Sequence, residues 1–257
     1  MTLLPTVSFR DRRGRLIRAV RERIAGGGIL RGCFIGFTDP RIIDVWASAG
    51  IDLVALDLEH GAHTTESADE IIAAAVDAGV LPLVRVSATD TQLALRALDS
   101  GAAGVMVADV RTATQVREWR TRIEYPPAGT RGVSSTRALD WGLPLLTTDG
   151  ASSPLLVPML ETLEASEGVR ELVAAPGADW WHIGRTDLTA DLTVYADAPP
   201  VGRVVDAIHA EAQAVGMPLG ENGSLTDAAG AARARVVMVT DRQLTFAAGS
   251  GFADGPR

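Results

Sequence analysis

Residues 81–108 read LPLVRVSATDTQLALRALDSGAAGVMVA, and this stretch contains the pattern that decides the fold. It has an apolar run at 81–86, an Ala- and Leu-rich helical stretch at 91–100 and a second apolar run at 103–108. Near-continuous apolar strands joined by helices are typical of parallel sheets with both faces covered. The stretch therefore predicts a strand–helix–strand unit with parallel strands.

The same unit recurs on both sides of this stretch. Further apolar runs of strand length occupy residues 32–38, 52–57, 154–161, 178–184, 217–221 and 236–240. Further helical stretches occupy residues 16–25, 40–49, 67–78, 112–123, 163–174, 201–215 and 225–233. Eight strands in 257 residues give about 32 residues per unit, which predicts an α/β fold of the (β/α)8 TIM-barrel class. An open doubly wound sheet is the alternative, but the first run lacks the G-x-G-x-x-G fingerprint that would favour it.

The sequence predicts a single domain with an addition at each end. Residues 1–28 form a short N-terminal helical extension that ends at three consecutive glycines. Residues 29–248 form the barrel, and residues 249–257 form a flexible tail. The segment 125–153 is rich in Pro and Gly, and we expect an active-site loop or a contact between subunits there.

The composition excludes several classes of chemistry. All 24 basic side chains are arginines, so Schiff-base aldolases, lysine-anchored pyridoxal phosphate and Walker-type phosphate loops are excluded. The single cysteine, Cys33, excludes disulfide pairs and multi-cysteine metal sites, and it favours a reducing compartment, the cytoplasm. The net charge of -8 argues against nucleic acid as a partner. The chain has no run of about 18 consecutive apolar residues, so the sequence predicts no membrane span.

Ionisable residues gather where the predicted strands end. In a barrel of this class the βα loops at the carboxyl ends of the strands build the active site. Four strand ends carry strongly polar groups: Asp57, Glu59 and His60 on the second, Arg85 on the third, Glu161 on the fifth and Asp187 on the sixth. Polar groups beside apolar strand ends are costly unless they serve one another or a ligand. We therefore place the candidate site at this end of the barrel.

Each of these residues has a structural and a functional interpretation. Glu161 and Asp187 are ordinary loop acids, or together they offer hard oxygen donors to Mg2+ or Mn2+. Arg85 forms a buried ion pair with Asp57, or its planar guanidinium binds a carboxylate or carbonyl oxygen of a ligand. His63, in the loop after the second strand, is a candidate substrate-binding residue.

Two further histidines are not assigned to the site. His182 lies inside an apolar run and is typical of a core residue. His209 lies on a predicted helix face, where we expect exposure to solvent.

Six short motifs appear in a characteristic order: DLEHG at 57–61, LVR at 83–85, LDSGA at 98–102, YPPAGTRGV at 125–133, ET at 161–162 and IGRTDL at 183–188. Together they resemble the HpcH/HpaI family of class II, metal-dependent 2-oxo-acid aldolases. The match spans roughly residues 32–241. The resemblance implies that the chain uses a divalent metal ion and acts on small molecules, a 2-oxo acid and an aldehyde.

The resemblance also implies roles for individual residues. Glu161 and Asp187 match the metal-binding pair of the family. Arg85 matches the arginine that polarises the oxo group of bound pyruvate. His60 matches the histidine that acts, through a metal-bound water, as general acid–base on the aldol hydroxyl.

Further positions match residues that support this chemistry. Asp57 and Asp99 match carboxylates that orient the histidine, partly across a subunit boundary, and Glu59 would hold the metal's water molecules. Gly184, Arg185 and Thr186 would bind substrate, with backbone N–H groups from Gly184 to Asp187 presented to the pyruvate carboxylate.

The chain departs from the family pattern at three places, one of which is the loop around residues 140–153, which is shorter than expected. The usual Gly-Pro-x-Asp-Leu is Gly-Arg-Thr-Asp-Leu at 184–188. Arg185 therefore adds a cation, which binds a second anionic group of the substrate or pairs with a neighbour. The C-terminal helix, which helps subunits associate in relatives, is predicted to be cut short after Asp241. We expect a homo-oligomer of undetermined subunit number.

The predicted function is that of a carbon–carbon lyase that joins or separates a pyruvate-type enolate and an aldehyde. Because the chain has no lysine to form an imine, a Lewis-acid cation and a fixed guanidinium must hold the enolate charge. Condensation with an oxo acid, as in citrate-synthase-like relatives, and decarboxylation are alternatives that use the same groups. A non-catalytic binding barrel is a third interpretation.

Overall fold

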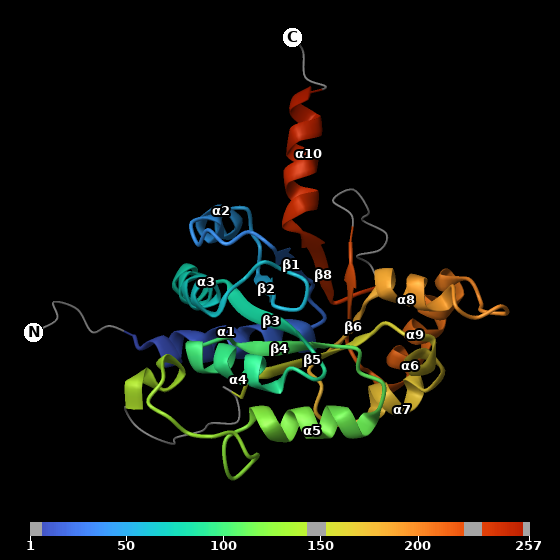
Figure 1. The fold of residues 1–257 in the computed structure, drawn as a ribbon, viewed down its shortest axis with the longest axis horizontal. Helices are drawn as coiled ribbons and strands as arrows, with labels where there is room; N and C mark the ends of the chain where they lie inside the picture. Colours follow the sequence, from blue (N-terminus) through green and yellow to red (C-terminus); the bar gives the residue numbers. More distant parts are fainter. Residues whose placement is uncertain (1–6, 143–152, 224–232, 254–257) are drawn as a thin grey trace, which may run out of the picture.

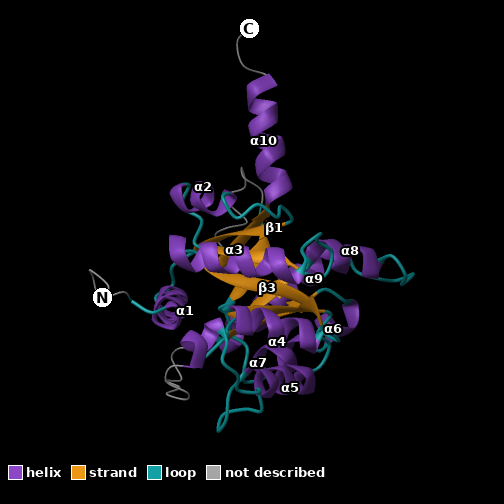
Figure 2. Ribbon diagram, turned by 60° about the vertical axis from the view of Figure 1, so that its left-hand side comes forward, coloured by secondary structure: helices purple, strands orange, loops and turns teal. Residues whose placement is uncertain are grey.

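The computed structural model describes residues 7–142, 153–223 and 233–253. Eight parallel strands close into a barrel in chain order, with each strand beside its neighbour in the sequence. They are β1 (Leu30–Ile35), β2 (Leu53–Asp57), β3 (Leu81–Ser87), β4 (Gly104–Ala108), β5 (Leu155–Leu160), β6 (Trp181–Ile183), β7 (Leu219–Asn222) and β8 (Val236–Thr240). The predicted (β/α)8 barrel is confirmed. Figure 2 shows the strands enclosed by helices.

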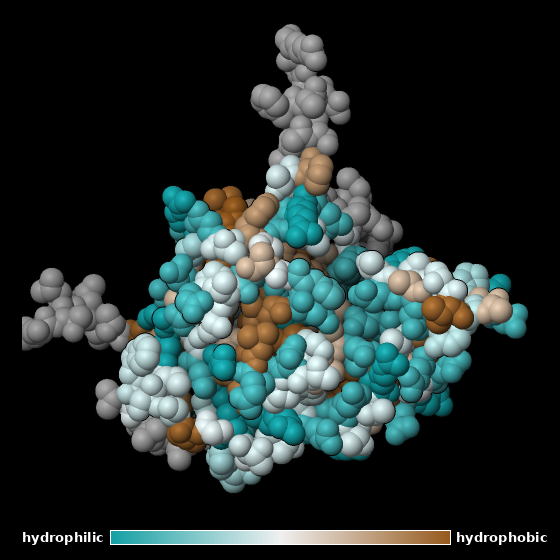
Figure 3. Space-filling view, viewed as in Figure 1, coloured by the Kyte–Doolittle hydropathy of each residue, from teal (hydrophilic) through white to brown (hydrophobic). Residues whose placement is uncertain are grey.

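Helices cover the outside of the barrel. They are α2 (Ile42–Ser48), α3 (Thr65–Ala78), α4 (Thr91–Ser100), α5 (Ala113–Ile123), α6 (Leu163–Glu167), α7 (Val169–Ala174), α8 (Arg185–Leu192) and α9 (Val201–Val215). A large apolar cluster between strands and helices includes Ile71, Trp119 and Ile208. In Figure 3 hydrophilic side chains cover most of the visible face, with an apolar patch near its centre.

A second apolar cluster fills the inside of the barrel. Strand residues such as Leu53, Leu81 and Met238 meet Ile17 and Val20 of α1 (Phe9–Ala25) there. Because Leu53 and Leu81 are the first residues of their strands, α1 closes the amino-terminal end of the barrel. The opposite, carboxyl-terminal end remains for the site.

Several predicted elements differ from the structure. Helix α1 begins at Phe9 rather than at residue 16, because Ser8 caps it by accepting a hydrogen bond from the Asp11 N–H at 3.1 Å. The predicted helix at 163–174 is divided by Gly168 into α6 and α7. Helix α8 was not predicted.

The C-terminal part of the chain also differs. Helix α10 (Asp241–Ala253) follows β8 directly and projects away from the barrel (Figure 1). It includes residues 249–253 of the segment for which a flexible tail is predicted. Nearly all of the predicted helix at 225–233 lies outside the described residues. Of the predicted loop at 125–153, residues 143–152 lie outside them, and the 3-10 segment Arg137–Gly142 is the last part described before this gap. Among the described residues, no helix combines the length and apolar character that crossing a membrane requires.

Candidate active site

The structure brings the predicted strand-end residues together at the carboxyl-terminal end of the barrel. Two adjoining cavities open there. One, of about 220 Å3, is lined by Met159, Gly184, Thr186 and Asp187 and is called the Asp187 cavity below. The other, of about 230 Å3, is lined by Asp57 and Asp241 among others and is called the Asp241 cavity. Four residues line both cavities and therefore mark their junction: Phe34, His60, Arg85 and Asn222.

Asp57 and Arg85 form an ion pair across two neighbouring strands. They lie opposite each other in the β2–β3 register. Arg85 Nη2 and Nε donate to the two Asp57 oxygens at 2.6 and 3.0 Å. Burial alone would raise the pKa of Asp57, but the hydrogen bonds from Arg85 and from the His60 N–H hold it below its usual value. The ion pair expected under the structural interpretation is therefore present in the fold. The pair uses Nε and Nη2 of Arg85 and leaves Nη1 available to a ligand.

The same carboxylate shapes the loop after β2. Asp57 Oδ1 accepts hydrogen bonds from the backbone N–H groups of Glu59 and His60, at 3.1 and 3.0 Å. A Cβ at position 61 would lie 2.1 Å from the Asp57 carbonyl oxygen, so this tight turn requires Gly61. Asp57 thus fixes the backbone that carries the His60 ring. No hydrogen bond between Asp57 and the ring itself is present in the described structure.

Glu161 holds a buried carboxylate that is only half satisfied. Its side chain follows β5 and is 7% exposed. Oε1 accepts a hydrogen bond from the Asp109 N–H, whereas Oε2 is buried without a partner among the described residues. Burial raises the pKa of Glu161 to about 7, and the nearby negative charges of Asp187 and Glu59 act in the same direction. A buried oxygen without a donor is costly and indicates that a ligand belongs there.

The donor set around Glu161 fits a hard divalent cation. Asp187 lies in the first turn of α8 on the neighbouring strand connection and lines the Asp187 cavity. Gly184 leaves the room that the Glu161 carboxylate occupies, because a Cβ there would lie 2.5 Å from Oε2. Within the described residues no cluster of three His, Cys, Asp or Glu side chains suited to a metal is present. Two carboxylates are sufficient for Mg2+ or Mn2+, which take remaining ligands from water and substrate.

The first turn of α8 supplies backbone donors to the same cavity. The predicted N–H of Gly184 is not among them, because it donates to the Leu160 carbonyl at 2.9 Å. The first intrahelical bond of α8 runs from the Leu188 N–H to the Gly184 carbonyl, so the three intervening N–H groups have no partner inside the helix. Thr186 lines the cavity, whereas the Arg185 side chain is exposed.

His60 stands at the junction of the two cavities with an accessible ring. Its side chain is 67% exposed, and Nε2 lies 3.8 Å from Glu59 Oε2. Asp99, the other predicted partner of this histidine, lies in the last turn of α4, and Arg131 donates a hydrogen bond to its carboxylate at 2.7 Å. Since α4 runs back to the start of β4, Asp99 lies at the opposite end of the barrel. Within one chain the structure does not bring Asp99 to His60.

The remaining histidines have structural contacts. His63 Nε2 lies 2.9 Å from the Ile35 carbonyl, Nδ1 lies 3.5 Å from Ser67 Oγ, and the residue lines neither cavity. The prediction that His209 is exposed was wrong: its ring is 11% exposed and contacts the Glu221 carboxylate. His182 is fully buried, as predicted for a core residue.

Sequence reasoning missed several residues that line the cavities. Asn222 and Met159 come from β7 and β5, and Arg242 is the second residue of α10, which follows β8 directly. Their positions at strand ends were a usable signal for Asn222 and Arg242. Met159 offers no polar signal.

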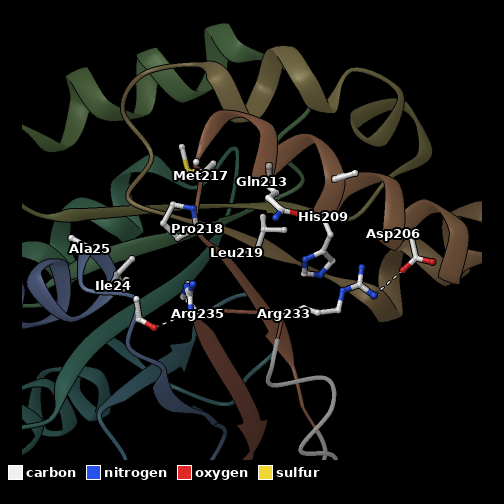
Figure 4. Close-up of a pocket in the computed structure, with 14 residues that line it drawn as sticks. Ile24, Ala25, Asp206, His209, Gln213, Met217, Pro218, Leu219, Arg233 and Arg235 are labelled. Carbon is white, nitrogen blue, oxygen red and sulfur yellow. Dashed lines mark hydrogen bonds and ion pairs between the residues drawn. The ribbon is translucent and has the colours of Figure 1, made fainter.

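A wider cavity, of about 670 Å3, lies elsewhere on the molecule (Figure 4). It is bounded by the end of α1, the end of α9 and the start of β7. Arg233 pairs with Asp206 at 2.8 Å, and Arg235 donates to the Gly27 carbonyl at 2.8 Å. This cavity is at the amino-terminal end of the barrel, away from Glu161 and Asp187, and its arginines already have protein partners.

A parallel barrel with acid, base and guanidinium groups at the carboxyl ends of its strands defines an enzyme of the TIM-barrel class. The chain belongs to the HpcH/HpaI aldolase/citrate lyase family, whose sequence profile matches residues 30–219. The expected family is thus confirmed.

Individual relatives agree with this assignment. The chain is 30% identical over 181 residues to a hydroxypyruvate/pyruvate aldolase of Roseovarius nubinhibens, covering 69% of this chain and 70% of the relative. It is 32% identical over 189 residues to a 2-dehydro-3,6-dideoxy-6-sulfogluconate aldolase of Pseudomonas putida, covering 71% and 73%. Among solved structures, a HpcH/HpaI aldolase/citrate lyase family protein from Burkholderia cenocepacia superposes with a TM-score of 0.81 at 25% identity, covering 92% of this chain and 98% of that one.

Proposed function

We propose that this chain is a divalent-metal-dependent lyase that breaks or forms the carbon–carbon bond between a pyruvate-type enolate and an aldehyde. The observation that carries the proposal is the buried, partnerless Oε2 of Glu161 beside Asp187, at the end of a barrel whose chain has no lysine. Relatives named hydroxypyruvate/pyruvate aldolase and sulfogluconate aldolase support the reaction class.

Glu161 and Asp187 would hold the metal ion, Mg2+ or Mn2+. When bound, the ion supplies Lewis-acid stabilisation of the negative charge that develops on the oxo-acid oxygens. Arg85 adds a second, protein-borne stabiliser: Asp57 fixes its guanidinium plane, and Nη1 donates toward the oxo oxygen. The N–H groups of the first turn of α8 face the oxo-acid carboxylate, where the positive end of the helix favours an anion.

Proton transfer at the aldol hydroxyl is assigned to His60. An imidazole can accept a proton in cleavage and return it in condensation. The Asp57-bound turn fixes the His60 backbone at the cavity junction, and the exposed ring can approach a substrate there. Glu59, close to both His60 and Arg85, would hold water molecules of the metal ion.

The assembly and surroundings of the protein follow from two residues. A role for Asp99 in orienting His60 requires a second copy of the chain, because one chain holds the two residues at opposite ends of the barrel. We therefore infer a homo-oligomer. Cys33 is a buried free thiol, which agrees with a reducing, cytoplasmic setting.

The test is exchange of the C3 protons of pyruvate with deuterium, which requires enolisation and no aldehyde. We expect exchange with Mg2+ or Mn2+, loss of exchange with excess chelator, and loss in Glu161→Gln. Glu164→Gln is the matched control, because Glu164 is an exposed acid that pairs with Arg111 on the surface. Exchange at the same rate in chelator, or equal rates in the two variants, would contradict the proposal.

A further inference from the structure

The inner wall of the barrel places a histidine and an asparagine from adjacent strands in contact. His182 lies in β6 and is completely buried, and Asn222 ends β7 at the junction of the two cavities. His182 Nε2 lies 3.1 Å from Asn222 Oδ1. The contact therefore joins a fully buried ring to a side chain that reaches the substrate space.

The amide oxygen at this contact determines the tautomer of the ring. A carbonyl oxygen can only accept a hydrogen bond, so Nε2 must be the N–H of the imidazole. Nδ1 then carries the lone pair, which agrees with its lack of a partner among the described residues. Phe34 packs edge-on against the ring with centroids 5.7 Å apart, and Gly220 makes room for it, since a Cβ there would lie 2.7 Å from Nδ1. The ring is thus held in one tautomer and one position.

Fixing Oδ1 also fixes the other end of the amide. Nδ2 carries two N–H donors and has no hydrogen-bond acceptor in the part of the chain that the structure describes. It belongs to a residue that lines both cavities. A pre-oriented donor without a protein acceptor is suited to a ligand oxygen.

The position of Asn222 indicates which substrate it meets. Asp187, from the predicted metal-binding pair, and Gly184 and Thr186, from the predicted carboxylate-binding turn, line the Asp187 cavity and not the Asp241 cavity. The oxo acid therefore occupies the former and leaves the latter for the aldehyde, with the new bond forming at the junction. In the closed eight-strand order, β7 stands opposite β3, so Asn222 faces Arg85 across this junction.

We propose that Asn222 is a specificity-determining residue that donates a hydrogen bond from Nδ2 to an oxygen beside the carbonyl of the acceptor aldehyde, and that His182 is the positioning residue that holds its amide. The acceptor class is then a 2-hydroxyaldehyde in preference to a simple alkanal. This inference rests on the proposed lyase function and adds the identity of its acceptor.

The experiment compares glycolaldehyde with acetaldehyde as acceptors for pyruvate. For the unmodified protein we expect the higher kcat/KM with glycolaldehyde. In Asn222→Ala this preference should fall by roughly 10- to 100-fold, the range for losing one hydrogen bond from a built site. In His182→Phe the amide loses its anchor, and the preference should fall in the same direction. Pyruvate C3 exchange, which needs no aldehyde, is measured for both variants and separates an effect on the acceptor from an effect on the oxo acid.

Three outcomes overturn the inference. An unchanged preference in Asn222→Ala shows that the amide does not contact the acceptor. A raised KM for pyruvate in the exchange reaction shows that Asn222 binds the oxo acid instead. An unmodified protein that catalyses neither exchange nor addition overturns the proposed function and this inference together, whereas exchange without the predicted change of preference overturns this inference alone. Circular dichroism melts of both variants confirm that they remain folded.

Discussion

The buried His182 predicts a specific dependence of stability on pH. Burial lowers the pKa of His182 from 6.5 to about 4, with smaller influences from the Asn222 hydrogen bond, Glu221 and Arg85. Between these two values the unfolded chain binds a proton that the folded protein does not. The folded state therefore loses stability as the pH falls from about 6.5 toward 4, and the loss is complete below the lower value.

The magnitude follows from the size of the pKa difference. Each pKa unit corresponds to about 1.4 kcal/mol, so His182 should account for a loss of about 3 kcal/mol between pH 7 and pH 4. Because the ring has no exposed surface, little of this is screened by solvent. His182→Phe keeps an aromatic ring against Phe34 and removes the titrating group.

The assay is urea unfolding of both proteins at pH 7 and near pH 4.5. Other groups, including Glu161 with its raised pKa, titrate in both proteins and largely cancel in the comparison. We expect the unmodified protein to lose about 2–3 kcal/mol more than His182→Phe on acidification. Equal losses in the two proteins would refute the reasoning, because His182 would then be able to take up its proton while folded.

Three further predictions concern other parts of the molecule. Asp57→Asn removes the partner of the half-buried Arg85 guanidinium and should lower the free energy of unfolding by about 3 kcal/mol while slowing pyruvate exchange; urea denaturation and the exchange assay check it, and a fully stable variant would contradict it. Gly184→Ala places a Cβ against Glu161 and should weaken Mn2+ binding by roughly 10- to 100-fold without unfolding the barrel, as titration calorimetry would show; unchanged affinity would contradict the assigned donor. Ile17→Ala leaves a cavity where α1 closes the amino-terminal end of the barrel, and it should lower the free energy of unfolding in urea by about 2–5 kcal/mol, with metal affinity retained. A loss of metal affinity in a folded variant would show that α1 acts beyond closing the barrel.

The parts of the fold that could be predicted are those encoded in short stretches. Apolar strands and amphipathic helices alternate at a regular spacing, so the barrel followed from periodicity. The Asp57–Arg85 pair could be foreseen as an alternative because both residues close neighbouring strands. The predicted start of helix α1, at residue 16, was too late. The first turns of the helix are rich in arginine and lack an apolar stripe, although Ser8 supplies a cap.

The parts that could not be predicted depend on register and on pairing between strands. The contact between His182 and Asn222 requires β6 and β7 to align His182 with Gly220, which no local pattern encodes. His209 is covered because Glu221 of β7 reaches it, and a helix face gives no sign of that contact. Asp99 matches a family motif, yet its α4 position places it at the other end of the barrel. This position agrees with the contact across a subunit boundary that the family resemblance implies for Asp99.

The central claim, that Glu161 and Asp187 together hold a divalent cation that serves the reaction, is tested most directly by anomalous diffraction. Crystals grown with Mn2+ and oxalate, a mimic of the enolate, should show one anomalous peak between the two carboxylates, and Glu161→Gln crystals should show none. The absence of a peak at this position in the unmodified protein, together with undiminished pyruvate exchange in excess chelator, would contradict the account.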